Sequence, residues 1–265
     1  MQSLKGKTAL ITGAGKGIGK AVALALAEEG VNVVLVARTA ADVEAVAKEA
    51  EAKGVKAFAL TADVAELVSI TTAVEKAVAK FGTIDILINN AGIFKPQAFT
   101  DITDADWFKF FEVNVLSGVR LSRHYFPKMI AKDWGRIIFI SSESAVNIPE
   151  EMIHYGMTKT AQLAVSRGLA ELTKGTNVTV NSVLPGPTKS EGVAEFVKQL
   201  GAANNVSTEQ AETDFFKDAR PTSLLQRFTS VEEIANLVTY VASPLSSGTN
   251  GSALKVDGGV AKFII

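Results

Sequence analysis

Short apolar segments alternate with longer segments of helical composition along most of this chain, and this alternation constrains its fold more than any other feature. Mainly apolar segments predict strands at residues 8–11, 31–36, 56–60, 84–88, 137–140 and 178–183. Segments rich in helix-forming residues predict helices at 19–29, 40–53, 66–80, 104–132 and 155–173. Strands that are apolar along their length are typical of parallel strands covered by helices on both faces. The alternation predicts an α/β fold, a doubly wound (Rossmann) parallel sheet that binds ligands at the carboxyl ends of its strands.

One segment, 186–228, departs from this alternation with two short predicted helices, 191–200 and 208–218. No Pro/Gly-rich linker, composition break or internal repeat divides the 265 residues. We therefore expect residues 1–265 to form a single domain, with a helical lid insertion at 187–228 near the ligand end of the sheet.

The composition excludes several classes of function. With 27 basic and 28 acidic residues, the chain has no basic excess for binding a nucleic-acid backbone or an anionic membrane surface. It has no cysteine, and its two histidines, His124 and His154, belong to no metal-ligand cluster, so we expect no disulfide and no metal site. The N-terminus lacks a signal peptide's apolar core, and no apolar run reaches the roughly 18 residues that span a bilayer. These absences favour a small-molecule partner and a cytoplasmic location.

A glycine-rich loop with the sequence TGAGKGIG, residues 12–19, joins the first predicted strand to the first predicted helix. Glycine permits positive φ angles and close approach of a ligand to the backbone. The amides of such a loop and the N-terminus of the following helix favour a phosphate or pyrophosphate. The spacing is G-x-x-x-G-x-G and differs from the common dinucleotide fingerprint, so a glycine-rich turn without a ligand is the alternative.

Further motifs follow the glycine loop in order. They are Asn89-Asn90-Ala91-Gly92 after the fourth strand, Asn114, Ser142, the pair Tyr155 and Lys159, the segment NSVLPGPTKS at 181–190, and VDGG at 256–259. In this order and spacing they resemble the short-chain dehydrogenase/reductase family over nearly the whole chain, and in particular its 3-oxoacyl-(acyl-carrier-protein) reductases. The resemblance implies a nicotinamide-dependent oxidoreductase in which Asn114, Ser142, Tyr155 and Lys159 are catalytic.

Tyr155 and Lys159 lie four residues apart in a predicted helix, so both side chains share one face. A free tyrosine has a pKa of about 10, and a nearby ammonium group is expected to lower it. The phenol could then exchange a proton with the substrate oxygen while hydride moves to or from a nicotinamide. A tyrosine and a lysine at this spacing also occur together by chance, so the prediction depends on the other motifs.

Ser142 follows the fifth strand and could donate a hydrogen bond to the reacting oxygen, with Ser141 and Ser144 as rivals. The alternative role for Ser141 is to cap the strand end. For Asn114, the resemblance implies that its backbone carbonyl holds a water that relays protons to the lysine, and the alternative is a solvated or capping asparagine. Glu143 stands where the family often has a small residue. We expect it to point to solvent, although it could instead shape the substrate mouth.

The end of the second strand, Val36-Ala37-Arg38-Thr39, lacks the carboxylate that binds the ribose 2′-hydroxyl in NAD enzymes. Arg38 suits a 2′-phosphate instead, and the resemblance brings Lys16 towards the same group, so we predict NADP(H). The resemblance also implies that Asp63 and Val64 meet the adenine. The expected cofactor-binding residues are Gly13, Gly15, Lys16, Gly17, Ile18, Gly19, Arg38, Asp63, Val64, Asn90, Ala91, Gly92, Tyr155, Lys159, Pro185, Gly186, Thr188 and Ser190.

The substrate pocket is expected between residues 94–99, 144–154 and the 187–228 insertion. Its expected substrate-binding residues are Ser142, Ser144, Ile148, Tyr155 and Pro187. Phe94, Phe196 and Phe215 would make it mainly apolar, or they could be plain core of the insertion, and His154 is expected to be a packing or solvent-facing ring. Relatives that act on carrier-bound substrates tend to have basic residues where this chain has Asp133 and Trp134, so a free ketone or sugar-type substrate stays open.

We therefore expect NADPH-dependent reduction of a carbonyl to an alcohol. The alternatives are an NAD-dependent alcohol or sugar dehydrogenase and, from a different class, a dinucleotide-binding regulator without turnover. The resemblance further implies a homotetramer that pairs the helices near 116–132 and 155–173 and uses the C-terminal strand. The apolar tail at 263–265 would fit burial against a partner.

Overall fold

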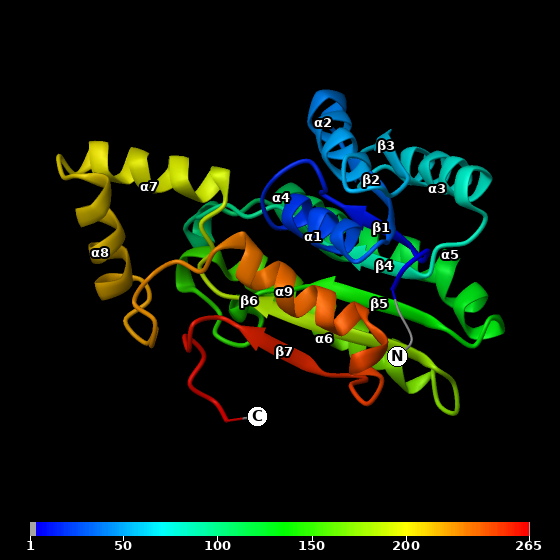
Figure 1. Ribbon diagram of the computed structural model, residues 1–265. Coiled ribbons are helices and arrows are strands. Elements are labelled where there is room, and N and C mark those ends of the chain that lie inside the picture. Colours follow the sequence, from blue (N-terminus) through cyan, green and yellow to red (C-terminus); the bar gives the residue numbers. More distant parts are fainter. Residues whose placement is uncertain (1–3, 265) are drawn as a thin grey trace.

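The computed structural model describes residues 4–264, and within them seven parallel strands form one sheet with helices on both faces (Figure 1). The strand order is β3-β2-β1-β4-β5-β6-β7. The strands are β1 (Thr8–Thr12), β2 (Asn32–Ala37), β3 (Ala57–Thr61), β4 (Ile86–Asn89), β5 (Gly135–Ile140), β6 (Val178–Pro185) and β7 (Ala253–Val256). The order reverses direction between β1 and β4, which is where a doubly wound sheet opens its ligand-binding crevice. The predicted fold class is confirmed.

Two hydrophobic layers hold the helices on the sheet. Ile86 and Ile88 of β4 pack into one layer and Leu87 into the other, because successive side chains of a strand point to opposite faces. The first layer is covered by α1 (Gly17–Glu28), α2 (Ala40–Glu51) and α9 (Val231–Ala242), the second by α3 (Leu67–Phe81), α5 (Ser117–Ala131) and α6 (Ile153–Glu171). Each fully buried side chain of this kind stabilises the fold by about 1.5–3 kcal/mol. Helices therefore cover both faces of the sheet, and only the edges of the sheet remain for ligand binding.

The helical stretch predicted at 104–132 is divided into three parts. Its first part, α4 (Asp104–Phe111), starts at a capping box in which Thr103 and Asp106 exchange hydrogen bonds. A π-helical segment, η2 (Glu112–Leu116), then leads into α5. Single π-turns displace carbonyl groups from the α-helical pattern and often occur at functional sites. Asn114 lies in this turn.

The insertion at 187–228 contains α7 (Glu191–Ala203) and α8 (Thr208–Asp218), which start at the capping serines Ser190 and Ser207. It has a small apolar core of its own, which consists of Val197, Ala211, Phe216 and Phe228. Figure 1 shows both helices beyond the carboxyl ends of the strands. The two helices confirm the prediction from sequence, and their action as a lid stays a prediction.

The remaining helical turns are single 3-10 turns at the sheet edges. They are η1 (Phe99–Asp101), η3 (Glu143–Ala145), η4 (Glu150–Met152) and η5 (Pro244–Ser246). Across residues 4–264 no helix combines the length and the apolar character needed to cross a membrane. Of the C-terminal tail, Ile264 is exposed and Ile265 lies outside the described residues.

Candidate active site

A cavity of about 490 Å³ lies at the carboxyl edge of the sheet, next to the insertion. One end is polar and is lined by Ser142, Glu143, Ser144, Tyr155 and Lys159. The rest is mainly apolar and is lined by side chains that include Ile93, Phe94, Met152, Phe196, Phe215 and Phe228. Three of the four predicted catalytic residues thus meet in one cavity although they come from separate elements, β5 and α6.

Tyr155 is half-buried in the first turn of α6, with its ring edge-on to Phe94 at a centroid distance of 6.3 Å. Burial is the largest influence on the phenol and raises the pKa of Tyr155 to about 12, and a hydrogen bond with Ser142 acts in the opposite direction. This differs from the lowered pKa expected from sequence, because loss of solvent outweighs the hydrogen bond. The phenol therefore keeps its proton at neutral pH.

Lys159 is 4% exposed, and its ammonium nitrogen lies 5.6 Å from the centre of the Tyr155 ring. Nζ donates to the Ile140 carbonyl at 2.9 Å and to Gln162 Oε1 at 3.4 Å. Burial lowers the pKa of Lys159 to about 7, because removal from water penalises the charged form. Lys159 therefore changes charge near neutral pH.

Asn114 lies behind the cavity and is fully buried at 1% exposure. Its side chain exchanges hydrogen bonds with both backbone groups of Ile93, at 2.8 and 3.0 Å, and donates to Thr158 Oγ1 at 2.9 Å. The alternative of a solvated asparagine is therefore wrong. Its backbone carbonyl accepts a hydrogen bond from Gln162 Nε2 at 2.5 Å. The sequence analysis missed Gln162, although its position three residues after Lys159 places both on one face of a helix.

The three serines of the β5 end have different surroundings. Ser141 Oγ donates to the Lys159 carbonyl at 2.9 Å, so its hydroxyl proton is engaged by the backbone of α6. Ser142 Oγ accepts from the Ser144 amide at 3.1 Å and forms the hydrogen bond that lowers the pKa of Tyr155. Ser144 is 2% exposed and lines the cavity. Ser142 is therefore the hydroxyl paired with Tyr155, and Ser141 has a structural contact.

Glu143 is 3% exposed, so the expectation that it points to solvent is wrong. Its Oε1 accepts from Arg220 Nε at 2.9 Å, and its Oε2 has no hydrogen-bond partner among the described residues. Arg220 is 9% exposed, follows α8 in the insertion and lies 3.7 Å from Glu151 as well. Burial raises the pKa of Glu143, and the guanidinium of Arg220 opposes that rise. A buried ion pair thus ties the insertion to the residue beside Ser142.

The glycine loop has the geometry that a close ligand requires. Gly13 and Gly17 have positive φ angles of 65° and 54°. A Cβ at Gly19 would lie 2.2 Å from the Gly13 carbonyl oxygen, so only glycine fits there. The Gly17 amide, at the N-terminus of α1, donates to the carboxylate Oε2 of Glu191 at 2.9 Å. A carboxylate therefore already occupies an anion position at this helix end, which is the chemistry expected for a phosphate.

Asn90 connects the glycine loop to β4. Its side-chain amide donates to the carbonyl oxygens of Thr12 and Gly13 at 2.8 and 3.3 Å. Thr12 Oγ1 in turn accepts from the amides of Asn90 and Ala91, each at 3.0 Å. Asn90 and Gly92 line the cavity, and this network fixes the loop against them. Thr12, which the sequence analysis left without a role, is thus part of the frame of the site.

Arg38 is exposed directly after β2 and makes no ion pair or hydrogen bond with the residues that the structure describes. Lys16 pairs with Asp42 of α2 at 3.2 Å, so this cation is shared with a carboxylate. Asp63 follows β3 and binds the Ala65 amide at 2.9 Å, with the buried Val64 between them. These residues lie along the same carboxyl edge as the glycine loop, outside the cavity lining.

The segment after β6 closes the other side of the cavity, with Pro185, Gly186, Pro187, Thr188 and Ser190 in its lining. A Cβ at Gly186 would lie 2.5 Å from the Asp257 carbonyl oxygen, which explains glycine at this close approach. Thr188 Oγ1 donates to the Gly186 carbonyl at 2.9 Å and holds the turn. Ile18, at the start of α1, lines the same cavity. The glycine loop and the segment at 181–190 therefore border the same cavity.

Two residues near the expected pocket lie elsewhere. Ile148 is 46% exposed and is not among the cavity-lining residues, because it packs over Gly156, where the absence of a Cβ leaves room. His154 is fully buried between Trp107 and Phe110, with ring centroids 5.9 and 4.0 Å away. Within the part of the chain that the structure describes, neither ring nitrogen of His154 has a hydrogen-bond partner, and burial lowers the pKa of His154. His154 is a packing residue, as expected.

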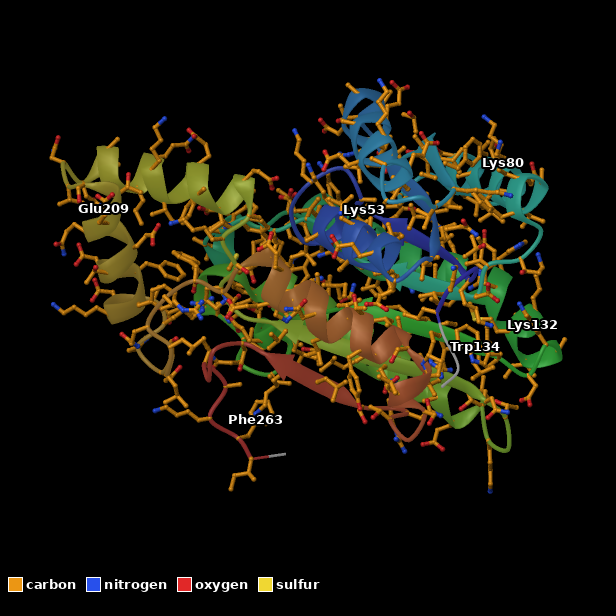
Figure 2. All side chains as sticks on the ribbon, in the orientation of Figure 1. Lys53, Lys80, Lys132, Trp134, Glu209 and Phe263 are labelled. Atoms are coloured by element: carbon orange, nitrogen blue, oxygen red, sulfur yellow. The ribbon has the colours of Figure 1, made fainter. Side chains whose placement is uncertain are left out.

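Trp134 lies at the opposite end of β5 from the cavity, close to Lys132 (Figure 2). Its ring has the cations of Lys7 and Arg136 at 3.9 and 4.7 Å from its centre. Asp133 accepts hydrogen bonds from the Asn177 amide and side chain at 2.9 and 2.8 Å. Within residues 4–264, no group of three or more His, Asp or Glu side chains is arranged to hold a metal ion.

Comparisons with known proteins agree with this geometry. The family model for short chain dehydrogenases matches residues 7–201. The uncharacterized oxidoreductase YvaG of Bacillus subtilis is 47% identical over 262 residues, which cover 99% of this chain and 98% of that protein. The 3-oxoacyl-(acyl-carrier-protein) reductase FabG of Aquifex aeolicus is 33% identical, over 97% of this chain and 98% of its own. The crystal structure of L-sorbose reductase from Gluconobacter frateurii, complexed with NADPH and L-sorbose, matches with a TM-score of 0.94 at 32% identity and 99% coverage of both chains. This chain belongs to the short-chain dehydrogenase/reductase family of oxidoreductases.

Proposed function

We propose that this protein is an NADPH-dependent carbonyl reductase in which Tyr155 protonates the substrate oxygen. The observation that carries the proposal is the convergence of Ser142, Tyr155 and Lys159 at the polar end of a cavity bordered by the glycine loop and β6. A nicotinamide dinucleotide fits the loop because the Gly17 amide already holds a carboxylate and a Cβ at Gly19 is sterically excluded. When bound, the cofactor supplies the hydride.

The proton chemistry follows from the three side chains. Tyr155 keeps its proton at neutral pH and can donate it to a developing alkoxide. Ser142 can donate a second hydrogen bond to the same oxygen. The ammonium of Lys159 stabilises the phenolate that remains after the transfer. A raised tyrosine pKa supports reduction over oxidation, because oxidation needs the phenolate as the base.

The charge of Lys159 predicts the pH dependence of reduction. Above a pH of about 7 Lys159 loses its positive charge, so kcat/KM for reduction should fall as the pH rises between about 7 and 9. The measurement is kcat/KM against pH with saturating NADPH and a ketone from a panel. Lys159→Arg, whose guanidinium stays charged, should lack this alkaline limb whatever activity it retains. A level profile from about pH 6 to pH 9 in the unmodified enzyme would contradict the assignment.

Arg38 supports NADPH over NADH, because a planar cation that has no partner among residues 4–264 stands where NAD enzymes place a carboxylate. Replacing it by aspartate, Arg38→Asp, should raise the KM for NADPH by about 10–100-fold, since losing a charge-assisted hydrogen bond costs about 1.5–3 kcal/mol. The KM for NADH should fall or stay the same. Arg123→Asp, an exposed arginine on α5 across the sheet from α1, is the matched control. Equal KM values for NADPH in Arg38→Asp and the control would favour the NAD-dependent dehydrogenase instead.

For the substrate, the mainly apolar cavity supports a small ketone, held near Ser142, Ser144, Tyr155 and Pro187. Solved relatives act on different molecules, including L-sorbose, so a panel of free sugars, cyclic ketones and 3-oxoacyl thioesters is the direct comparison. Turnover of any of them excludes the regulator without catalysis. The homotetramer stays a prediction, tested by light scattering of the protein in solution.

A further inference from the structure

Gln162 belongs to the same stripe of α6 as the two reactive side chains. Tyr155, Lys159 and Gln162 stand at positions i, i+4 and i+7, which share one face of a helix. Gln162 is 2% exposed, so its amide must find partners inside the protein.

Both ends of the Gln162 amide are engaged, and the chemistry fixes which end faces which partner. The Asn114 carbonyl can only accept, so the amide nitrogen must face it, at 2.5 Å. The amide oxygen then faces Lys159, whose ammonium can only donate, at 3.4 Å. A flipped amide would place acceptor against acceptor and donor against donor. The side chain is therefore an oriented bridge from Asn114 to Lys159.

The Asn114 end of the bridge is anchored firmly. Asn114 lies in the π-helical turn η2, and all three hydrogen bonds of its side chain hold that turn to Ile93 and Thr158. The carbonyl that Gln162 binds thus belongs to a segment tied to two other parts of the site. A bridge anchored in this way restricts the position of the group at its other end.

At the Lys159 end, the bridge directs the ammonium. An ammonium has three N–H donors, and here one meets the Ile140 carbonyl and a second meets Gln162 Oε1. The third is left for the cavity, which Lys159 and Tyr155 both line. Other charged groups near this cluster, Glu143 and Arg220, have opposite effects on the pKa of Tyr155. A hydrogen bond accepted from the charged form of a group favours that form, so the amide oxygen of Gln162 favours the ammonium of Lys159 over the neutral amine.

We propose that Gln162 is a positioning residue of the reaction: its amide is anchored on the Asn114 carbonyl and orients the Lys159 ammonium for proton transfer by Tyr155. The role rests on the proposed function. In this role, the side-chain amide of Gln162 is the group that contacts the Asn114 carbonyl.

Two substitutions act on the bridge in opposite ways. Gln162→Leu removes both hydrogen bonds, so the ammonium loses an acceptor and the pKa of Lys159 should fall by about 0.5–1 unit. Gln162→Glu places a carboxylate beside the ammonium and should raise the pKa of Lys159 by about one unit or more, while it loses the donor to Asn114. We expect kcat for reduction to fall about 10–100-fold in both variants, because the ammonium is no longer held in place. The alkaline limb of kcat/KM should move down in the first variant and up in the second.

The decisive measurement is a titration of the Lys159 side chain by ¹³C or ¹⁵N NMR in the protein without dinucleotide, with the signal assigned by its absence in Lys159→Ala. Ser166→Ala is the matched control, because Ser166 is buried one turn further along α6 and its hydroxyl bonds to none of the residues that the structure describes. It should leave both the titration and kcat unchanged. Opposite shifts in the two Gln162 variants support the proposal.

A lower kcat with an unmoved Lys159 titration in the variant that folds would assign Gln162 a packing role and overturn the proposal. An unchanged kcat with unchanged titration would overturn it equally. If one variant fails to fold, the direction of the shift in the other decides. The NMR titration needs no turnover, so it is separate from the failure of the proposed function, which loss of ketone reduction by the unmodified enzyme would reveal.

Discussion

Tyr155→Phe should reduce kcat/KM for ketone reduction by about 100–10,000-fold, the usual contribution of a general acid. The substitution removes only the hydroxyl, so the ring contact with Phe94 and the shape of the cavity stay. Ser142 keeps its position through the Ser144 amide. The measurement is steady-state kinetics with NADPH and a reducible ketone, together with NADPH binding followed by nucleotide fluorescence. Binding should change little, because the loss concerns the proton.

Tyr125→Phe is the matched control for this variant. Tyr125 lies on α5, is 1% exposed, and its hydroxyl has no hydrogen-bond partner in residues 4–264. Removing that hydroxyl should therefore leave the kinetics unchanged. If Tyr155→Phe retained more than about a tenth of the original kcat/KM, another group would have to donate the proton and the proposed chemistry would be wrong.

Arg220→Met should destabilise the protein by about 3–5 kcal/mol, because it leaves the Glu143 carboxylate buried without its partner. Methionine keeps most of the side-chain volume, so the loss reports the charge more than a cavity. The measurement is the free energy of unfolding from urea titration. The double variant Glu143→Gln with Arg220→Met should regain most of the loss, since no buried charge then remains. Arg227→Met, which breaks an exposed ion pair with Glu233, should change stability little.

The loss in Arg220→Met should depend on pH. Burial already raises the pKa of Glu143, and removing the guanidinium raises it further. A carboxyl whose pKa is higher in the folded than in the unfolded protein binds more protons when folded, so the variant gains stability as the pH falls through the folded pKa. The difference from the unmodified protein should therefore be largest near neutral pH and shrink in acid. A constant difference between about pH 7 and pH 4 would mean that Glu143 does not carry the effect.

Local sequence patterns predicted most of the sheet because parallel strands buried on both faces are apolar along their length. The strand predicted at 137–140 corresponds to the carboxyl-terminal part of β5. The helix predicted at 40–53 corresponds to α2, which ends two residues earlier than predicted. Helix α9 was missed, although Ser230 and Glu233 form a capping box that marks its start. Its apolar residues belong to the same hydrophobic layer as those of α1 and α2, and such packing depends on contacts between residues far apart in the chain.

Tyr155 and Lys159 could be paired from the sequence because a spacing of four residues puts both on one face of a helix, whereas Asn114 and Ser142 were implied by the resemblance to the family. The contacts between distant parts of the chain could not be predicted. Arg220 lies 77 residues after Glu143, and a lone glutamate in a sequence is most often a solvated charge, so its burial came as a correction. The direction of the Tyr155 shift was likewise wrong, because it depends on how much solvent the folded cavity excludes.

The hydrogen bond from the Gly17 amide to Glu191 has a consequence for cofactor affinity. One amide proton cannot serve the carboxylate and a phosphate oxygen together, so this protein carries a tethered competitor for the anion that it is proposed to bind. Binding is then an exchange of one anion for another, and a measured affinity reports their difference instead of the full strength of the glycine loop. Glu191 is also the first residue of α7, so this exchange acts on the beginning of the insertion. Anion binding at the glycine loop and the attachment of the start of α7 to that loop are in this way linked through the single amide proton of Gly17.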